Sequence, residues 1–415
     1  MPRHRTPPPA VVRRTGTAPR EGVRVSTSAS TLAFVESPVQ LLNVLEWAYA
    51  RGTAADRPLD GVPSQRGRRA AGRAAEPGPR PAGTLAPLRI VVLPPTDPMS
   101  RGQLRRMAAL ARDEGCDVQW QEARGSRLAP LRALAALAGD VRAARTVVIG
   151  DPFSRYVQLL LTLVRAEELV VVDDGTATME FVAQTARGER LVRWHRVGGG
   201  GLPGRVRELA YAPVSAAARR RFVAERAAGR GAEHRVELFT SMPVAPCGGM
   251  TLRANEFAWT RARFGPPRLT RGTDLVGTSL VETGVVDPGR YLDAVRSLAL
   301  EHGATRYFAH RRESPEKLRA LSRATGLEIV RPDLPLELIA RRGPVGRTIL
   351  SFPSTVVHTL PYALTGTGVT VAVCDVDPAW LTGSASPRAR SFLAGVTDTA
   401  RDVHRLPAQA APGAG

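Results

Sequence analysis

Asp173 and Asp174, followed by Gly175, stand directly after an apolar β-type run, where side chains could do chemistry. Two adjacent carboxylates at a buried strand end repel each other, so their pKa values tend to separate and one can act as a base. Gly175 allows a sharp turn and the close approach of a substrate. An Asp-Gly turn with a helix cap accounts for the same three residues equally well.

His310 follows another β-type run and precedes Arg311 and Arg312. An imidazole at this place can donate a hydrogen bond to a phosphate or to a leaving oxygen. A surface histidine in a basic turn is the simpler interpretation of the sequence alone. Ser354 and Thr355 follow a third run, and two hydroxyls with backbone amides at a helix start can bind an anion. Ordinary helix capping would need only one of these hydroxyls.

Together, these groups offer a carboxylate in one half of the chain and an imidazole with two hydroxyls in the other. Group transfer from a nucleotide-activated sugar requires such a combination. A base deprotonates the acceptor hydroxyl, while hydrogen-bonding groups hold the departing phosphate.

The elements that must position these residues follow from the hydrophobic pattern. Continuous Val, Ile and Leu runs alternate with helical patterns, which is typical of parallel sheets covered on both faces. The predicted strands, some with their turns, cover residues 31–35, 88–93, 116–121, 146–151, 168–175, 274–279, 305–309, 327–330, 348–352 and 370–376. The clearest predicted helices cover 39–50, 101–114, 127–137, 154–165, 291–302 and 314–325. Ligands of such sheets bind at the carboxyl ends of the strands, where the polar groups lie.

The α/β pattern occurs twice, which predicts two Rossmann-like domains that face each other across a cleft. We place the first domain at residues 30–265 and the second at 266–404. Residues 1–29 and an insertion at 51–87 are of low complexity and are predicted to be disordered, and 405–415 are predicted to form a loose tail.

Several common chemistries lack their motifs in this sequence. No GxGxxG follows an early strand, and no GxxxxGK[ST] or GxSxG is present, which argues against nicotinamide, P-loop and α/β-hydrolase chemistry. The glycines at 198–201 lie outside any βα turn and are interpreted as a loop. No His, Asp or Glu set has metal-ligand spacing, and Asp375 and Asp377 are interpreted as part of a turn. We therefore predict no metal site.

The net charge of +20 raises the alternative of an arginine-rich protein that binds nucleic acid or another polyanion. Residues 1–30 carry a net charge of +5 and residues 51–87 carry +4, so the remainder is only moderately basic. Aromatic residues make up 5%, which is few for stacking on single strands. We expect no nucleic-acid partner, whereas the alternative predicts steeply salt-dependent binding.

The cysteines and the lengths of the apolar runs indicate in which cellular compartment the protein is expected. Cys116, Cys247 and Cys374 are far apart and form no CxxC pair, which excludes a disulfide framework or a zinc cluster and fits a reducing compartment. No run reaches the length of a membrane span, and the Arg/Pro-rich start lacks the apolar part of a signal peptide. These features predict a cytoplasmic protein, compatible with peripheral association at the inner face of the membrane.

The chain resembles bacterial sialyltransferases of the GT-B architecture, in particular the capsule polysialyltransferase (alpha-2,8-polysialyltransferase) and lipooligosaccharide sialyltransferase families. Those families share a D/E-D-G motif, a His-Pro motif and a Ser/Thr motif. The matching segments, in order, are Glu36–Asn43, Ile149–Asp151 with Ser154, Asp173–Gly175, Leu275–Ser279, Tyr307–Ser314, Pro335–Leu338 and Ser351–Thr355. One departure is Arg311, which stands where the family has the proline after its histidine.

The resemblance implies a GT-B fold and an inverting transfer of a sialic acid, or a related nonulosonic acid, from its CMP ester to a glycan hydroxyl. By position, Asp174 would be the general base, and His310 the general acid or the hydrogen-bond donor to the leaving phosphate. Ser354 and Thr355 would hold that phosphate. The other donor-binding candidates are Glu337, Gly277 and Ser279.

The acceptor side is assigned only by position. Asp173 and Gly175 are supporting candidates, and the residues expected to line the acceptor side are Ser37, Gln40, Asn43, Asp151 and Arg155. No cofactor is expected besides the donor, and no metal is needed because CMP carries a single phosphate. Two alternatives within the resemblance stay open: another donor such as CMP-Kdo, and an inactive relative in which the turn after His310 is not fixed.

Overall fold

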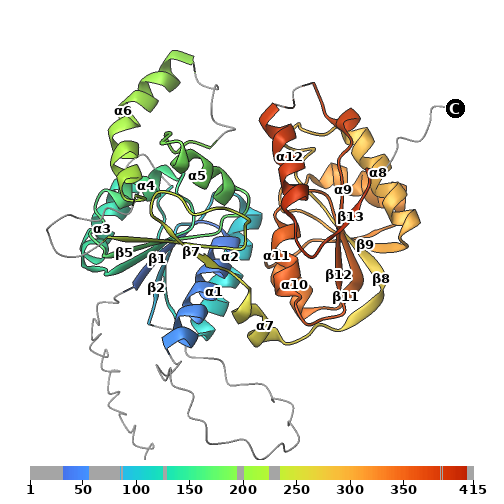
Figure 1. The fold of residues 1–415 in the computed structure, drawn as a ribbon, viewed down its shortest axis with the longest axis horizontal. Coiled ribbons are helices and arrows are strands. Elements are labelled where there is room, and N and C mark those ends of the chain that lie inside the picture. The colour runs from blue at the N-terminus through green and yellow to red at the C-terminus, as the bar shows by residue number, and fades with distance from the viewer. Residues whose placement is uncertain are drawn as a thin grey trace, which may run out of the picture.

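A computed structural model describes residues 31–55, 85, 87–124, 129–193, 201–223, 234–383, 385 and 387–408. Two α/β domains lie next to each other, the first in blue to yellow and the second in yellow to red (Figure 1). The predicted disordered segment 1–29 and residues 56–84 of the predicted insertion lie outside the described residues.

The first domain is built on a parallel sheet of seven strands in the order β3-β2-β1-β4-β5-β6-β7. These strands are β1 (Thr31–Val35), β2 (Arg89–Val92), β3 (Asp117–Trp120), β4 (Thr146–Ile149), β5 (Glu168–Val172), β6 (Arg235–Thr240) and β7 (Thr251–Ala254). Every residue of β4 and β5 is buried, which explains why their sequences read as continuous apolar runs.

Helices cover both faces of this sheet. They are α1 (Pro38–Ala55), α2 (Pro98–Asp113), α3 (Ala129–Ala143), α4 (Arg155–Leu161), α5 (Ala177–Ala186), α6 (Gly201–Arg220) and α7 (Ala258–Phe264). Alternate residues of β1 point to opposite faces, so Leu32 and Phe34 pack in one apolar cluster and Ala33 and Val35 in the other. The sheet is therefore buried on both sides, as predicted from its composition.

The second domain repeats this design with six parallel strands in the order β10-β9-β8-β11-β12-β13. Its strands are β8 (Leu269–Val276), β9 (Ala304–Phe308), β10 (Glu328–Val330), β11 (Val345–Ser351), β12 (Thr370–Cys374) and β13 (His404–Leu406). Its α-helices are α8 (Pro288–Glu301), α9 (Pro315–Thr325), α10 (Leu336–Arg342), α11 (Val356–Ala363) and α12 (Pro387–Thr399). Both domains thus have the doubly wound order, in which the crevice for ligands opens where the strand order reverses.

Some predicted boundaries are wrong. Helix α1 continues to Ala55 instead of ending at residue 50, and Leu85 is buried, so both ends of the predicted insertion belong to the first domain. Strand β13 pairs with β12, so residues 405–406 are not a loose tail. Gly201 is the first residue of α6, and the rest of the glycine run lies outside the described residues.

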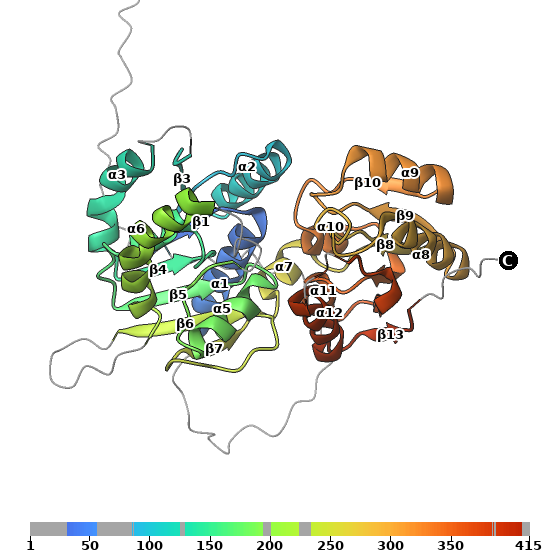
Figure 2. The same ribbon diagram turned by 90° about the horizontal axis from the view of Figure 1, so that it is seen from above.

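The two domains meet at α7, which lies between the two sheets (Figures 1 and 2). The buried Glu46 carboxylate of α1 accepts hydrogen bonds from the backbone amides of Trp259 (2.8 Å) and Thr260 (2.9 Å), which attaches α7 to the first domain. Leu334 and Leu338 of the second domain pack into an apolar cluster of the first. These contacts hold the carboxyl ends of both sheets toward each other, which is the GT-B-like architecture that the resemblance implies.

Candidate active site

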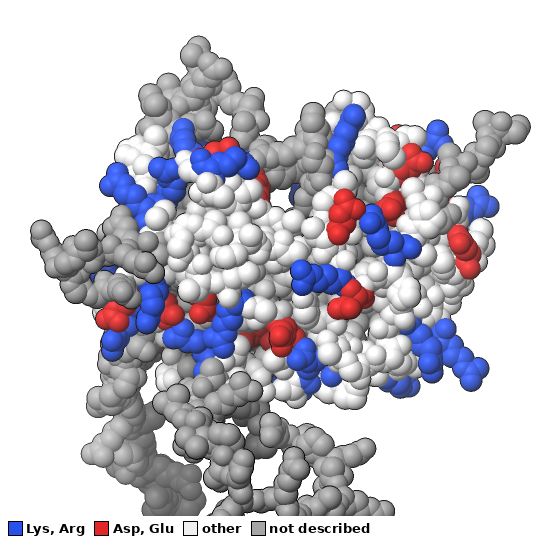
Figure 3. All heavy atoms as spheres, viewed as in Figure 1, with Lys and Arg blue, Asp and Glu red and all other residues white. Residues whose placement is uncertain are grey.

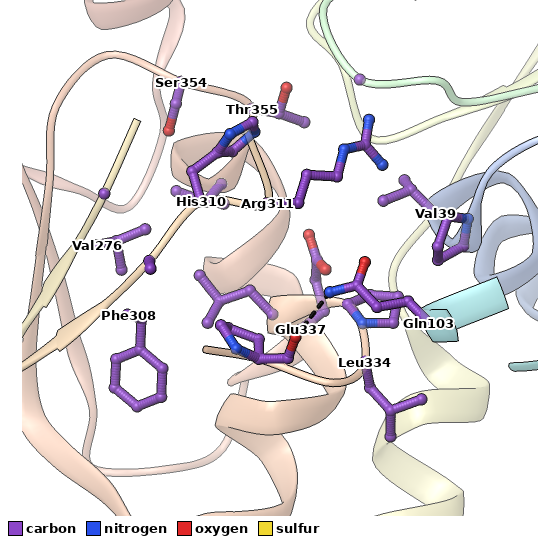
Figure 4. A pocket seen from close by; sticks show the side chains of 18 of the residues that line it. Val39, Gln103, Val276, Phe308, His310, Arg311, Leu334, Glu337, Ser354 and Thr355 are labelled. Atoms are coloured by element: carbon purple, nitrogen blue, oxygen red, sulfur yellow. Dashed lines mark hydrogen bonds between the residues drawn. The ribbon is translucent and has the colours of Figure 1, made fainter. Parts of the chain in front are cut away.

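A cavity of about 210 Å³ lies between the two domains, at the carboxyl ends of both sheets (Figure 4). The predicted site residues that line it are Asp174, Gly175, Gly277, His310, Glu337, Ser354 and Thr355. The first domain also contributes Pro38, Val39 and Gln103. The structure therefore brings the aspartate and the imidazole, which are remote in sequence, to one cavity.

Asp174 follows β5, and its carboxylate is held by an arginine that the sequence analysis did not single out. Asp174 Oδ2 accepts a hydrogen bond of 2.6 Å from Nη2 of Arg193, which also donates to Oδ2 of Asp151 at 2.9 Å. Burial raises the pKa of Asp174, the charge of Asp151 raises it further, and Arg193 opposes both. Arg193 lies outside helices and strands, so no periodic pattern marked it.

Asp173 faces a different environment from its neighbour. Its carboxylate accepts hydrogen bonds from the Ser241 amide (2.6 Å) and from the Thr240 hydroxyl, both at the end of β6. Burial raises its pKa to about 6. Repulsion between the adjacent aspartates, which the sequence suggested, is not the main cause of either pKa shift. Burial dominates both, and the acidic side chain that raises the pKa of Asp174 is Asp151. Asp173 holds strand ends together, so the two carboxylates have separate tasks.

His310 follows β9 and lies beside Ser354 and Thr355 at one end of the cavity (Figure 4). Its Nδ1 accepts a hydrogen bond of 3.2 Å from the Arg312 amide, so the ring proton is on Nε2. Burial, with the charges of Arg311 and Arg312, lowers the pKa of His310 to about 4. The imidazole is therefore neutral near pH 7, which favours a hydrogen-bond donor over a general acid.

Ser354 and Thr355 join β11 to α11. The side chain of Thr355 makes no capping hydrogen bond to α11, and the Ser354 hydroxyl lies 3.2 Å from that of Ser351. Both residues line the cavity. Simple helix capping, the plainer interpretation of this pair, therefore does not account for these hydroxyls.

The remaining donor-side candidates divide into two that reach the cavity and one that does not. Glu337 of α10 points into it, and Glu337 Oε1 accepts a hydrogen bond of 2.6 Å from the Thr359 hydroxyl (Figure 4). Burial raises the pKa of Glu337. Gly277 also lines the cavity. Ser279 lies in the following turn and does not line the cavity, so our prediction that it binds the donor is not supported by its position.

A second cavity of about 390 Å³ opens on the first domain, and Arg193 is part of its lining. Its polar and aromatic lining consists of Glu36, Arg124, Asp151, Phe153, Ser154, Arg155, Tyr156, Arg193 and Tyr211. The Arg155 guanidinium lies 5.3 Å from the centre of the Tyr211 ring. Asp151 and Arg155 are therefore the two predicted acceptor-side residues that the structure brings to this cavity.

The other three predicted acceptor-side residues have structural contacts instead. Ser37 accepts a hydrogen bond from the Gln40 amide at 3.2 Å, and the buried Gln40 accepts one from the Glu36 amide at 2.7 Å. Buried Asn43 donates to the Asp173 carbonyl oxygen at 2.9 Å and accepts from Asn255. Gln40 also makes a side-chain hydrogen bond to Asp174, which lowers the pKa of that carboxyl. None of the three residues lines either cavity.

Glu36 is a buried carboxylate that the sequence analysis left without a role. It lies 2.5 Å from Nη2 of Arg124 and accepts a hydrogen bond of 2.9 Å from the Ser154 hydroxyl. Burial raises its pKa to about 7, against the opposing charge of Arg124. Its position directly after β1 is the one feature of the sequence that could have marked Glu36 as a candidate site residue.

Three further observations concern the described part of the chain. No group of three His, Cys, Asp or Glu side chains in it could hold a metal ion. None of its helices combines the length and apolarity of a membrane span. Basic and acidic side chains are interspersed over the face shown in Figure 3.

No protein-family model matches this chain, and no curated protein does. Among solved structures, an alpha/beta-galactoside alpha-2,3-sialyltransferase from Photobacterium phosphoreum is similar at a TM-score of 0.45 and 8% identity, over 90% of this chain and 98% of that one. MurG of Acinetobacter baumannii gives 0.40 and 9%, over 91% and 86%. E. coli heptosyltransferase WaaC with ADP-2-deoxy-2-fluoro heptose gives 0.37 and 11%, over 91% and 92%. These similarities cover both domains, but the sequence identities are too low to indicate the reaction.

Proposed function

We propose that this protein is an inverting glycosyltransferase that moves a sialic acid, or a related nonulosonic acid, from its CMP ester to a glycan hydroxyl. One observation carries the proposal. Asp174 of the first domain lines the same cavity as His310, Ser354 and Thr355 of the second domain. A carboxylate on one wall and phosphate-binding groups on the opposite wall suit a transfer between two substrates.

The donor would lie against the second domain. The Nε2–H group of neutral His310 and the hydroxyls of Ser354 and Thr355 can donate to the phosphate, and Arg311 adds a positive charge to the cavity wall. Glu337 can accept hydrogen bonds from ribose hydroxyls. An apolar wall is available for the base and consists of Val276, Phe308, Leu334 and Leu336.

In the reaction, Asp174 accepts the proton of the acceptor hydroxyl as the oxygen attacks the anomeric carbon. The bond from that carbon to the phosphate oxygen breaks on the opposite side, and the electron pair leaves with CMP. Inversion follows from this single displacement. His310 stabilises the charge that develops on the departing phosphate by hydrogen bonding, which agrees with its neutral state.

The acceptor would approach from the second cavity. Phe153, Tyr156 and Tyr211 supply aromatic surface for sugar rings, and Arg155 supplies a cation for a carboxylate. Arg193 lines this cavity and donates a hydrogen bond to Asp174, so the carboxylate lies next to the acceptor cavity. We therefore propose an acidic glycan as the acceptor class.

The decisive experiment measures release of the nucleotide from CMP-sialic acid, CMP-Kdo and a UDP-sugar by the purified full chain, with and without an acidic oligosaccharide. We expect CMP-sialic acid to be consumed fastest, and faster with the acceptor present. Faster consumption of CMP-Kdo would show that CMP-Kdo is the donor instead of CMP-sialic acid. No turnover with any donor, together with steeply salt-dependent binding of nucleic acid, would replace the proposal with the polyanion-binding alternative. Cytoplasmic location, peripheral membrane association and metal independence stay predictions.

A further inference from the structure

The turn that carries His310 is closed without a proline. The Glu313 amide donates to the His310 carbonyl oxygen at 3.0 Å, so residues 310–313 form a β-turn with Arg311 and Arg312 in its middle. Many residues are compatible with such a turn, so its backbone needs another constraint. The position of the imidazole depends on that constraint, because His310 is the first residue of the turn.

The Glu313 side chain folds back beneath this turn. Its Oε2 accepts a hydrogen bond of 2.6 Å from the His310 amide, and its Oε1 accepts one of 2.7 Å from the Tyr307 hydroxyl. Nζ of Lys317 lies 2.7 Å from the same Oε1. Glu313 is 3% exposed, so the carboxylate is shielded from water and these charge-assisted bonds are strong.

Lys317, the single lysine of the sequence, is held from several sides. Its Nζ donates to the Thr278 carbonyl oxygen at 3.2 Å, lies 3.4 Å from the Glu282 carboxylate, and lies 4.2 Å from the centre of the Tyr291 ring. The backbone of Gly277 passes so close that a methyl group there would overlap Glu313 Oε2. The Glu313 carboxylate is therefore held in one position directly behind residues that line the cavity.

We propose that Glu313, held by Lys317, is a positioning residue that fixes the backbone of His310 and so aims the imidazole into the cavity. It gives the turn the rigidity that a proline at residue 311 would give. The effect of Glu313 on the rate depends on the proposed function, whereas its effect on the position of the imidazole depends on geometry alone.

The first test is kinetic. Glu313→Gln keeps the shape of the side chain but removes the charge that Lys317 and the His310 amide share. We expect kcat/KM for CMP-sialic acid to fall on the order of 10-fold to 100-fold, because small misplacements of a reacting group have such effects. Glu316→Gln is the matched control, since Glu316 lies on the same helix as Lys317, pairs with Arg319 at the surface and does not bond His310 or Lys317, and it should stay within about twofold.

The second test is rescue. Arg311 is the second residue of the turn, where proline is favoured, and its amide has no hydrogen-bond acceptor among the described residues. Arg311→Pro added to Glu313→Gln should therefore turn over the donor several-fold faster than Arg311→Ala added to Glu313→Gln, since both double variants lack the guanidinium that we place on the cavity wall. Arg311→Ala in the same background removes the same guanidinium without stiffening the turn and should recover none.

The third test does not depend on turnover. Nitrogen-15 NMR of the imidazoles, assigned with His310→Gln, should show His310 with its proton on Nε2 in the wild type. Glu313→Gln should shift His310 toward a mixture of tautomers, because the Arg312 amide loses its place at Nδ1. A wild-type protein that turns over no donor would defeat the proposed function and leave this test intact. Unchanged tautomer and unchanged kinetics in Glu313→Gln would overturn the positioning role.

Discussion

Gly175 and Thr355 belong to different domains, yet a methyl group added to Gly175 would lie only 2.7 Å from Oγ1 of Thr355. The end of β5 and the start of α11 are therefore in direct contact range across the cavity. Because Asp174 precedes Gly175, this contact sets how far the carboxylate lies from the phosphate-binding groups that we assign to the second domain.

Gly175→Ala should lower turnover by about tenfold or more, because Thr355 must move away from the donor phosphate. The substitution also strains a backbone with φ of +66°, which would destabilise the fold by about 1 kcal/mol. Gly188→Ala separates the two effects, since Gly188 has φ of +67° but its nearest neighbour is the flexible end of Arg219 at 3.5 Å. Thermal unfolding and kcat check both variants, and equal losses of kcat would contradict the cross-domain explanation.

Replacing each of the two neighbouring aspartates with asparagine should have a different main effect, on rate for one and on stability for the other. Asp174→Asn should lower kcat by about 10²-fold or more, because it removes the proposed base. Its effect on stability should be smaller than that of Asp173→Asn, because Arg193 keeps its ion pair with Asp151. Asp173→Asn should instead lower the free energy of unfolding by about 1–3 kcal/mol, because its amide cannot accept all the hydrogen bonds from Thr240 and Ser241. Kinetics and denaturant unfolding distinguish them, and the reverse pattern would make Asp173 the base.

Arg193→Gln should move the acidic limb of the pH–rate profile to higher pH. The ionised form of Asp174 is the active one, and its pKa is already raised by burial, so activity is lost as the pH falls through that pKa. Arg193 favours the ionised form, so its removal raises the pKa further. Arg187→Gln is the control, because Arg187 pairs with Glu189 at the surface. A limb that does not move would show that Asp174 does not control it.

His310→Gln should retain much more activity than His310→Ala. The glutamine amide can donate a hydrogen bond from about the place of Nε2, whereas alanine removes the donor, and we expect a loss of about 10²-fold for alanine. Because the pKa of His310 is lowered to about 4, its protonation should not appear in the wild-type profile near pH 6.5. A glutamine variant as slow as the alanine variant would favour general acid catalysis.

Arg155→Gln should raise the KM for an acidic acceptor several-fold, on the order expected for a partly exposed ion pair, and leave the KM for the donor unchanged. The difference between the wild type and the variant should shrink at high salt, because salt screens exposed charges. Arg132→Gln, an exposed arginine of α3 outside both cavities, is the matched control. Equal KM values for acidic and neutral acceptors in the wild type would remove the basis for an acidic acceptor.

The strands that carry the site could be predicted because burial on both faces leaves a local mark in the sequence. Strands β1, β4 and β5 read as apolar runs, as does the end of β11 at Ile349 and Leu350, and the polar residues after them lie on one edge of their sheets. Strand β7 and helix α7 were missed because β7 is largely exposed and α7 is short, so neither shows a sustained apolar pattern.

The partners of the site residues could not be predicted in the same way. Arg193 reaches Asp174, and Asn43 reaches the backbone of Asp173, through contacts that only the packed strands create. Even Glu313, three residues from His310, gives no sign in the sequence that it turns back under the imidazole.

Local residue order determined the alternation of strands and helices, the division into two halves, and the polar residues at the strand ends, because these depend on neighbours within a turn or a run. The docking of the two domains decided which of those residues share a cavity. It brought Asp174 and His310 together and left Ser279 outside, because distances between remote segments depend on sheet order and on side-chain packing at α7.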